Sequence, residues 1–217
     1  MRYRLALFDF DGTLADSFPW FATVVNDVAD KFGFRRIAPD ELDSLRGKSA
    51  REMIAYCGVS TWKLPFIANY MRKRKAQDLH TVKLFAKAAD TLRRLADAGV
   101  TVAIVSSNSE TNIRAMLGLE TATLVTHYEC GASMFGKAKR FKAVLHASKC
   151  SAADAICIGD EIRDLDAARA AGIAFGAVTW GYTTAEALRA LNPDHVFDTF
   201  GEIFDALAEP QSKAAVS

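Results

Sequence analysis

Short apolar runs alternate with amphipathic segments along most of the chain. The apolar runs occupy residues 4–10, 100–105, 123–126, 155–158, 173–179 and 195–197. Apolar residues recur at helical spacing in residues 88–98, 110–117, 139–148, 164–171 and 184–191. Buried strands that alternate with helices predict a parallel sheet covered by helices on both faces. We therefore expect a doubly wound, Rossmann-like α/β core.

One region, residues 18–82, interrupts this alternation. It contains no run that predicts a strand, whereas its apolar residues recur at helical spacing. We expect it to form a small all-helical unit inserted after the first strand, with the core made of residues 1–17 and 83–208. The last residues, 209–217, are small and polar, which predicts a flexible tail.

Composition and charge exclude several classes of protein. The chain has 217 residues, with 27 lysines and arginines against 26 aspartates and glutamates, so its net charge is +1. Such a balance gives no general electrostatic reason to bind nucleic acid or an anionic membrane. No apolar run approaches the roughly 20 residues that span a bilayer, and residues 1–10 are too short and too soon acidic for a secretion signal. We expect a cytoplasmic protein whose four scattered cysteines are free thiols, without a zinc site.

Polar side chains gather where the predicted strands end. They are Asp9, Asp11, Ser106, Lys137, Asp160 and Asp164. Because the carboxyl ends of parallel strands meet in one crevice, we expect these groups to lie close together. Clustered carboxylates repel one another unless a cation lies between them, and oxygen ligands of this kind suit Mg²⁺. The sequence therefore predicts a magnesium site at this edge of the sheet.

The run Asp9-Phe10-Asp11-Gly12-Thr13-Leu14 resembles the signature of the haloacid dehalogenase-like hydrolases. Further motifs of that family follow in order: Ser106 at the end of an apolar run, then Lys137, then Gly159-Asp160 with Asp164 beyond it. The resemblance covers the chain apart from the tail. Trp180-Gly181-Tyr182 and the helical insert most resemble phosphoglycolate phosphatase-like members, which carry a helical cap where residues 18–82 stand.

The resemblance implies a role for each matched residue. Asp9 would attack phosphorus and form an aspartyl-phosphate, while Asp11 would act as general acid and base. Mg²⁺ would be held by Asp9, Asp160 and the backbone carbonyl of Asp11. The phosphate would be bound by Lys137, by Ser106 and by the neighbouring Ser107. Supporting roles would fall to Gly12, Thr13, Glu161 and Asp164, with Asp164 orienting Lys137 or a metal-bound water.

Three assignments stay open at this point. Lys139 competes with Lys137, because the Pro-x-Pro that often follows the family's lysine is missing. Glu161 follows Asp160 directly, so it could itself reach the metal. Arg46 and Lys48 lie in the insert and could contact a carboxylate or second phosphate of the substrate; a surface loop in which Ser49 caps a helix is an equal alternative.

The function expected from these observations is Mg²⁺-dependent hydrolysis of small phosphate monoesters, with phosphoglycolate as the single best guess. The partner would be a small phosphorylated metabolite, and the protein a monomer or homodimer that binds neither nucleic acid nor membrane. One alternative is a phosphosugar mutase, which returns the phosphate to its substrate. Another is a regulatory module that accepts phosphate without turnover; the presence of Asp11 argues against it.

Overall fold

The computed structural model describes residues 2–131 and 136–208. Within these residues, one parallel sheet has six strands. The strands are β1 (Leu5–Phe8), β4 (Thr101–Val105), β5 (Val125–Glu129), β6 (Ala155–Gly159), β7 (Ala174–Val178) and β8 (His195–Phe197). Their spatial order is β5-β4-β1-β6-β7-β8. The strands that follow β1 in the chain are thus added first on one side of it (β4, β5) and then on the other (β6, β7, β8), and the order switches between β1 and β6. This is the predicted doubly wound α/β core, and it places a ligand crevice beyond the carboxyl ends of β1 and β6.

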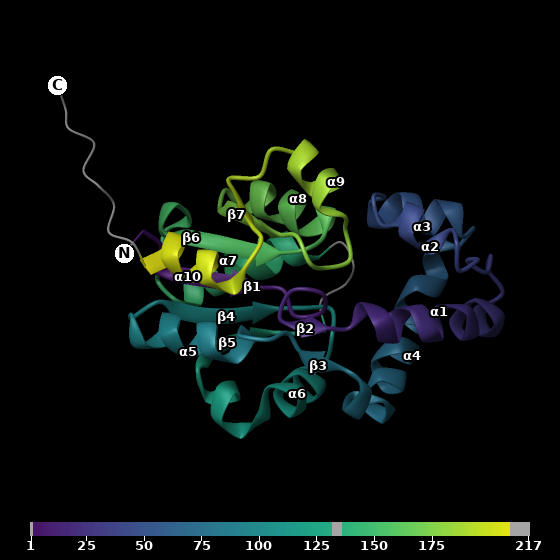
Figure 1. Ribbon diagram of the computed structural model, residues 1–217, viewed down its shortest axis with the longest axis horizontal. Coiled ribbons are helices and arrows are strands. Elements are labelled where there is room, and N and C mark those ends of the chain that lie inside the picture. Colours follow the sequence, from purple (N-terminus) through teal and green to yellow (C-terminus); the bar gives the residue numbers. More distant parts are fainter. Residues whose placement is uncertain (1, 132–135, 209–217) are drawn as a thin grey trace.

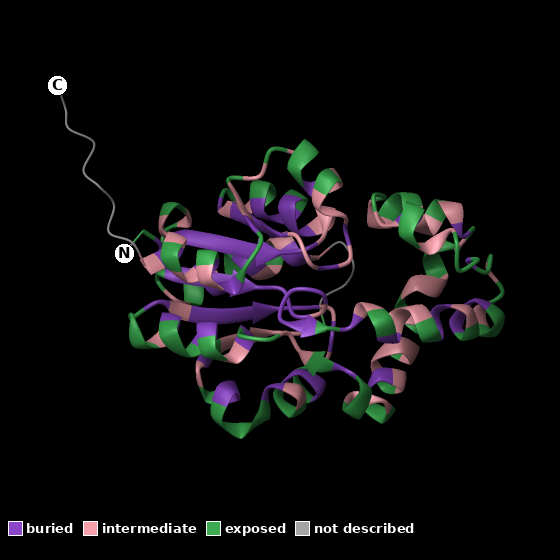
Figure 2. Ribbon diagram, viewed as in Figure 1, coloured by how far each residue is buried: buried purple, intermediate pink, exposed green. Residues whose placement is uncertain are grey.

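Alternate residues of the central strands pack against opposite helical layers. Ala6 and Phe8 of β1 join one core cluster, whereas Leu5 and Leu7 join the other. The first cluster is completed by α5 (Ala88–Asp97), α6 (Glu110–Thr123) and α10 (Phe200–Ala208). The second is completed by α7 (Lys137–Ala147), α8 (Ile162–Ala171) and α9 (Ala185–Ala190). Because both faces are covered, the central strands β1 and β6 are buried throughout and read as continuous apolar runs (Figure 2).

The segment after the first strand forms a separate group of helices. It contains α1 (Phe18–Phe32), α2 (Leu42–Leu45), α3 (Ala50–Tyr56) and α4 (Leu64–Gln77), with short 3₁₀ turns η1 (Thr61–Lys63), η2 (Leu79–Thr81). In Figure 1 this group lies beside the edge of the sheet toward which β4 and β6 point. We call residues 18–82 the helical insert. Its position places its inner side over the crevice at the strand ends.

Two very short strands join the helical insert to the core. β2 (Ala15–Asp16) and β3 (Lys83–Leu84) pair antiparallel, so the chain enters and leaves the insert at one place (Figure 1). The sequence does not predict this pair, because two residues are too few to show any periodicity. A three-residue 3₁₀ turn, η3 (Ala152–Asp154), precedes β6.

Several boundaries differ from those expected. A strand at 123–126 is wrong in position: α6 continues to Thr123 past the non-helical Gly118, and β5 begins only at Val125. Helix α7 starts at Lys137 instead of residue 139. Helix α10 was not predicted, although its residues Ile203 and Leu207 are fully buried. The tail expected at 209–217 lies outside the described residues. Among the residues described, no helix combines the length and apolarity needed to cross a lipid bilayer.

Candidate active site

The ends of the central strands bring three predicted residues into one buried place. Asp9 follows β1, Ser106 follows β4 and Asp160 follows β6; their exposed fractions are 2%, 0% and 0%. Phe8 is in register with Ile104 and with Ile158, so the three predicted residues lie within one position of one another along the adjacent strand ends. The strand-end convergence expected from the sequence is therefore present in the structure.

Asp9, Asp160 and Asp164 form a compact acidic cluster. One carboxylate oxygen from each lies within 4.8 Å of the others. All three are buried, and Asp164 reaches the cluster from the first turn of α8. Three carboxylates this close repel one another strongly unless positive charge lies among them.

Lys137 supplies part of that positive charge. Its Nζ lies 2.5 Å from Oδ1 of Asp164 and 2.9 Å from Oδ2 of Asp9, and the lysine is 3% exposed. Burial by itself lowers the pKa of Lys137, but the carboxylates of Asp164 and Asp9 outweigh it and raise this pKa above its usual range. The lysine therefore stays charged. Lys139, the competing candidate, is exposed to solvent.

Asp160 is held in a tight cradle of backbone and side-chain donors. The hydroxyl of Thr13 donates a hydrogen bond to Oδ1 (2.7 Å), and the backbone N–H of Tyr182 donates to Oδ2 (2.7 Å). Two glycines make room for it: a Cβ added at Gly12 would lie 2.2 Å from Oδ2, and one added at Gly181 would lie 2.1 Å from the Cβ of Asp160. Gly12 also has a φ of +82°, which side chains disfavour. The supporting positions Gly12 and Thr13 thus fix the Asp160 carboxylate.

The cluster has the chemistry of a divalent-cation site. Within residues 2–131 and 136–208, neither carboxylate oxygen of Asp9 accepts a hydrogen bond; its contact with Lys137 is an ion pair only. Burial, followed by the charges of Glu161 and Asp9, raises the pKa of Asp160 well above its ordinary value. Buried carboxylate oxygens without donors are costly, and a hard cation with oxygen ligands would satisfy them. Asp9, Asp160 and Asp164 therefore fit Mg²⁺.

The carboxylate of Asp11 is directed to other partners. Oδ1 lies 2.5 Å from Nζ of Lys75, which comes from α4 of the helical insert and is itself buried. Oδ2 accepts a hydrogen bond of 3.1 Å from the side-chain amide of Asn108. Neither partner has a role predicted from the sequence. Asn108 follows a predicted strand end, so its position in the sequence could have indicated that it lies near the site. Lys75 lies 64 residues from Asp11, at the basic end of a helix, and nothing in the sequence indicates their contact.

The two predicted phosphate-binding serines occupy the loop after β4. Ser106 is fully buried, and its hydroxyl oxygen accepts a hydrogen bond of 3.2 Å from the backbone N–H of Asn108. The carbonyl of Ser107 accepts a hydrogen bond of 3.3 Å from the guanidinium of Arg72, a residue of α4. The loop thus faces the helical insert as well as the crevice.

Glu161 lies next to the acidic cluster but is paired elsewhere. Its carboxylate forms an ion pair with Arg163, and its backbone N–H donates to Oδ2 of Asp164 (3.2 Å). The three-carboxylate cluster found among the described residues does not include it. Glu161 therefore contributes by fixing Asp164 and by placing negative charge near Asp160.

Arg46 and Lys48 both line the space between insert and core, in different ways. Arg46 donates from Nε to the carbonyl of Tyr182 (3.0 Å) and from Nη2 to the carbonyl of Gly181 (2.7 Å), so it joins the insert to the loop that cradles Asp160. Lys48 is exposed. Ser49 accepts a hydrogen bond from the backbone of Glu52 and begins α3, as the alternative reading of this loop expected.

Comparison with known proteins agrees with this architecture. The family model for haloacid dehalogenase-like hydrolases matches residues 6–178. A phosphoglycolate phosphatase of Synechococcus elongatus is 30% identical over 94% of this chain and 96% of its own length. A phosphoglycolate phosphatase of Agrobacterium fabrum is 29% identical over 94% of this chain and 92% of its own.

A solved structure gives the same picture at the level of the fold. It is a hydrolase of the haloacid dehalogenase-like family from Streptococcus pneumoniae, with a TM-score of 0.75, 22% identity, and coverage of 94% of this chain and 98% of its own. The family model spans most of the chain, and the relatives extend along nearly all of it. The chain belongs to the haloacid dehalogenase-like hydrolase family and is a phosphoglycolate phosphatase-like member of it.

Proposed function

We propose that this protein is a Mg²⁺-dependent phosphatase that hydrolyses small phosphate monoesters by transferring the phosphoryl group to Asp9. One observation carries the proposal: Asp9 is buried at the end of β1 with both carboxylate oxygens free of hydrogen bonds from the described residues, beside Lys137 and two further carboxylates. Family membership and the phosphatase relatives support the same reaction.

The reaction uses Asp9 and Asp11 in two stages. An oxygen of Asp9 attacks phosphorus, the bond from phosphorus to the ester oxygen breaks, and Asp11 donates a proton to the departing alcohol. Asp11 then accepts a proton from water, whose oxygen attacks the same phosphorus and releases inorganic phosphate. The carboxylate of Asp9 is regenerated, so each turnover consumes one ester and one water molecule.

The remaining residues control charge and position. Lys137 would place its ammonium against the phosphoryl oxygens, and Asp164 holds that ammonium at 2.5 Å. The buried Ser106 would donate a hydrogen bond to the phosphoryl group. Asp9, Asp160 and the backbone carbonyl of Asp11 would hold Mg²⁺, with Asp164 close by. The ion supplies positive charge that lets an anionic nucleophile approach an anionic phosphate.

Phosphoglycolate is the substrate to test first, because it appears in the names of the relatives. The experiment measures phosphate release from a panel of small monoesters, with and without Mg²⁺. Release should require Mg²⁺ and should be abolished in Asp9→Asn, while the matched control Asp16→Asn, which alters an exposed carboxylate of β2, keeps it. Full activity of Asp9→Asn would contradict the nucleophile. Absence of turnover on the whole panel would favour a module that accepts phosphate without hydrolysing it.

A further inference from the structure

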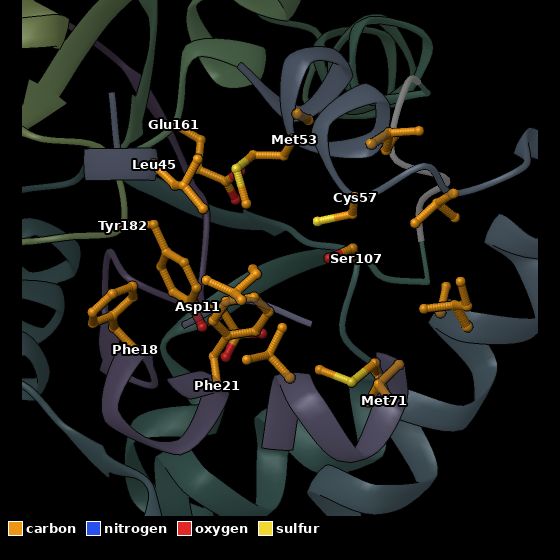
Figure 3. A pocket seen from close by; sticks show the side chains of 18 of the residues that line it. Asp11, Phe18, Phe21, Leu45, Met53, Cys57, Met71, Ser107, Glu161 and Tyr182 are labelled. Carbon is orange, nitrogen blue, oxygen red and sulfur yellow. The ribbon is translucent and has the colours of Figure 1, made fainter. Parts of the chain in front are cut away.

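A cavity of about 370 Å³ separates the helical insert from the strand ends. Asp11, Ser107 and Tyr182 line it from the core side, and Figure 3 shows their side chains facing the same space as Met53 and Met71 of the insert. The volume falls within the range of roughly 300–1,000 Å³ that small-molecule sites occupy. Because Asp11 lines the cavity, the space begins where the ester oxygen of a substrate would leave.

Most of the side chains that the insert contributes to this cavity are apolar, and four are cationic. The apolar lining residues from the three longer helices are Phe18, Trp20, Phe21, Val25, Val28, Ala50, Met53, Ile54, Leu64, Ile67, Ala68 and Met71. No residue of α3 is fully buried: Met53 packs in part against the hydrophobic cluster of the insert, and both Met53 and Ile54 stay partly exposed where they line the cavity. Methionine side chains adapt readily to the shape of a ligand. The insert thus presents partly exposed apolar side chains to the cavity that Asp11 also lines.

The cations around the cavity are largely engaged by the protein itself. Arg46 donates to two backbone carbonyls, and Arg72 donates to the carbonyl of Ser107. Lys75 is paired with Asp11, and Arg163 is paired with Glu161. Lys48 is exposed to solvent. A carboxylate placed in the apolar part of the cavity would lose its hydration without gaining one of these cations as a free partner.

We infer that the preferred substrate is a phosphate monoester whose alcohol carries an apolar body about the size of one ring, seated between α1, α3 and α4. This deepens the proposed function and rests on it for the orientation of the ester, with phosphorus at Asp9 and the alcohol toward the cavity. Such an ester would bind more tightly than one with a charged two-carbon body, because it buries apolar surface against the insert. Phosphoglycolate is the competing substrate, and Lys48 is the residue through which it would be recognised.

Two non-hydrolysable phosphonates separate these accounts without requiring turnover. The full-length protein with Mg²⁺ is titrated by calorimetry with 2-phenylethylphosphonate and with 3-phosphonopropionate, which share the phosphonate and its two-carbon chain and differ in ending with phenyl or carboxylate. We expect the phenyl compound to bind at least about tenfold more tightly, the lower end of the effect of one apolar group in a fitted pocket. Equal or tighter binding of the carboxylate compound overturns the inference.

A pair of variants on α3 locates the binding surface. Met53→Gln should weaken binding of the phenyl compound several-fold and leave 3-phosphonopropionate unchanged, which also shows that the variant is folded. The matched control Ala55→Gln alters an exposed position of the same helix outside the cavity and should change neither affinity. Lys48→Met should also leave the phenyl compound unaffected; a loss of phenyl binding equal in Met53→Gln and Ala55→Gln contradicts the location.

Hydrolysis assays tell failure of this inference from failure of the proposed function. Benzyl phosphate and phosphoglycolate are the ester counterparts of the two phosphonates. Hydrolysis of both with phosphoglycolate preferred supports the phosphatase and overturns the apolar site. Selective binding of the phenyl compound without hydrolysis of any ester supports the apolar site and overturns the phosphatase.

Discussion

Replacement of Lys137 by methionine removes an ammonium that lies inside the acidic cluster. Its Nζ is 2.5 Å from Asp164 and 2.9 Å from Asp9, and all three side chains are nearly inaccessible to water. The methionine leaves three buried carboxylates, each with an oxygen within 4.8 Å of the others. At an effective dielectric constant near 20, that separation corresponds to a repulsion of at least about 3 kcal/mol.

This repulsion agrees with the usual penalty for breaking a buried ion pair, about 3–5 kcal/mol. We therefore expect urea unfolding of Lys137→Met without Mg²⁺ to show a loss of that size in the free energy of unfolding. Since domains are typically stable by about 5–15 kcal/mol, the midpoint should shift clearly. Phosphate release should fall by about 10²-fold or more, because the phosphoryl oxygens lose a fixed positive charge.

Lys139→Met is the matched control, two residues away and exposed on the same helix. Its free energy of unfolding should change by no more than about 0.5 kcal/mol, with activity retained. If both variants unfolded at the same urea concentration, Lys137 would not sit between the buried carboxylates. If Lys137→Met kept full activity, the ammonium would have no part in neutralising the phosphate.

Three further changes test other parts of the site. Gly181→Ala would place a Cβ 2.1 Å from the Cβ of Asp160. It should weaken Mg²⁺ binding measured by calorimetry and leave the circular dichroism spectrum unchanged. Wild-type affinity for Mg²⁺ would contradict the claim that Gly181 makes room for the Asp160 carboxylate. Lys75→Met removes the ammonium that lies 2.5 Å from Oδ1 of Asp11. It should lower kcat about tenfold or more with little change in KM, because Asp11 loses a contact that positions it. An unchanged kcat would mean that this contact does not position Asp11. Burial, and next the charge of Arg2, lowers the pKa of His195 in the folded protein. As the pH decreases below about 6.5, the unfolded chain therefore binds more protons than the folded one, and the stability decreases. The thermal midpoint of the wild type should drop more between about pH 7.5 and about pH 5.5 than that of His195→Gln, and equal drops would contradict this.

The sequence predicts the centre of the fold well because the central strands are covered on both faces. Such strands are continuous apolar runs, and the acids that follow them stand out as polar residues at their ends. Asp9 and Asp160 could be brought together in advance because parallel strands converge on one edge of the sheet. Lys137 could be placed only by its resemblance to a family motif; its burial distinguishes it from Lys139.

The contacts that the sequence does not predict are those between the helical insert and the core. Lys75 meets Asp11 across 64 residues, and Arg46 meets the carbonyl of Gly181 across 135. No local pattern encodes such pairs, since each depends on how two separately folded layers pack. The cavity depends on the same packing: Met53 reads as an ordinary helix residue, and only the structure shows that it lines the space between insert and core.

Trapping the phosphorylated enzyme tests the role of Asp9 most directly. The protein is mixed with Mg²⁺ and a rapidly hydrolysed ester, quenched in acid and reduced with borohydride, which converts an aspartyl-phosphate to homoserine. Mass spectrometry of the peptide that contains the end of β1 should find homoserine at position 9, and only when ester is present. Phosphate release without reduction at this position, or with reduction at Asp160 or Asp164 instead, would contradict the account.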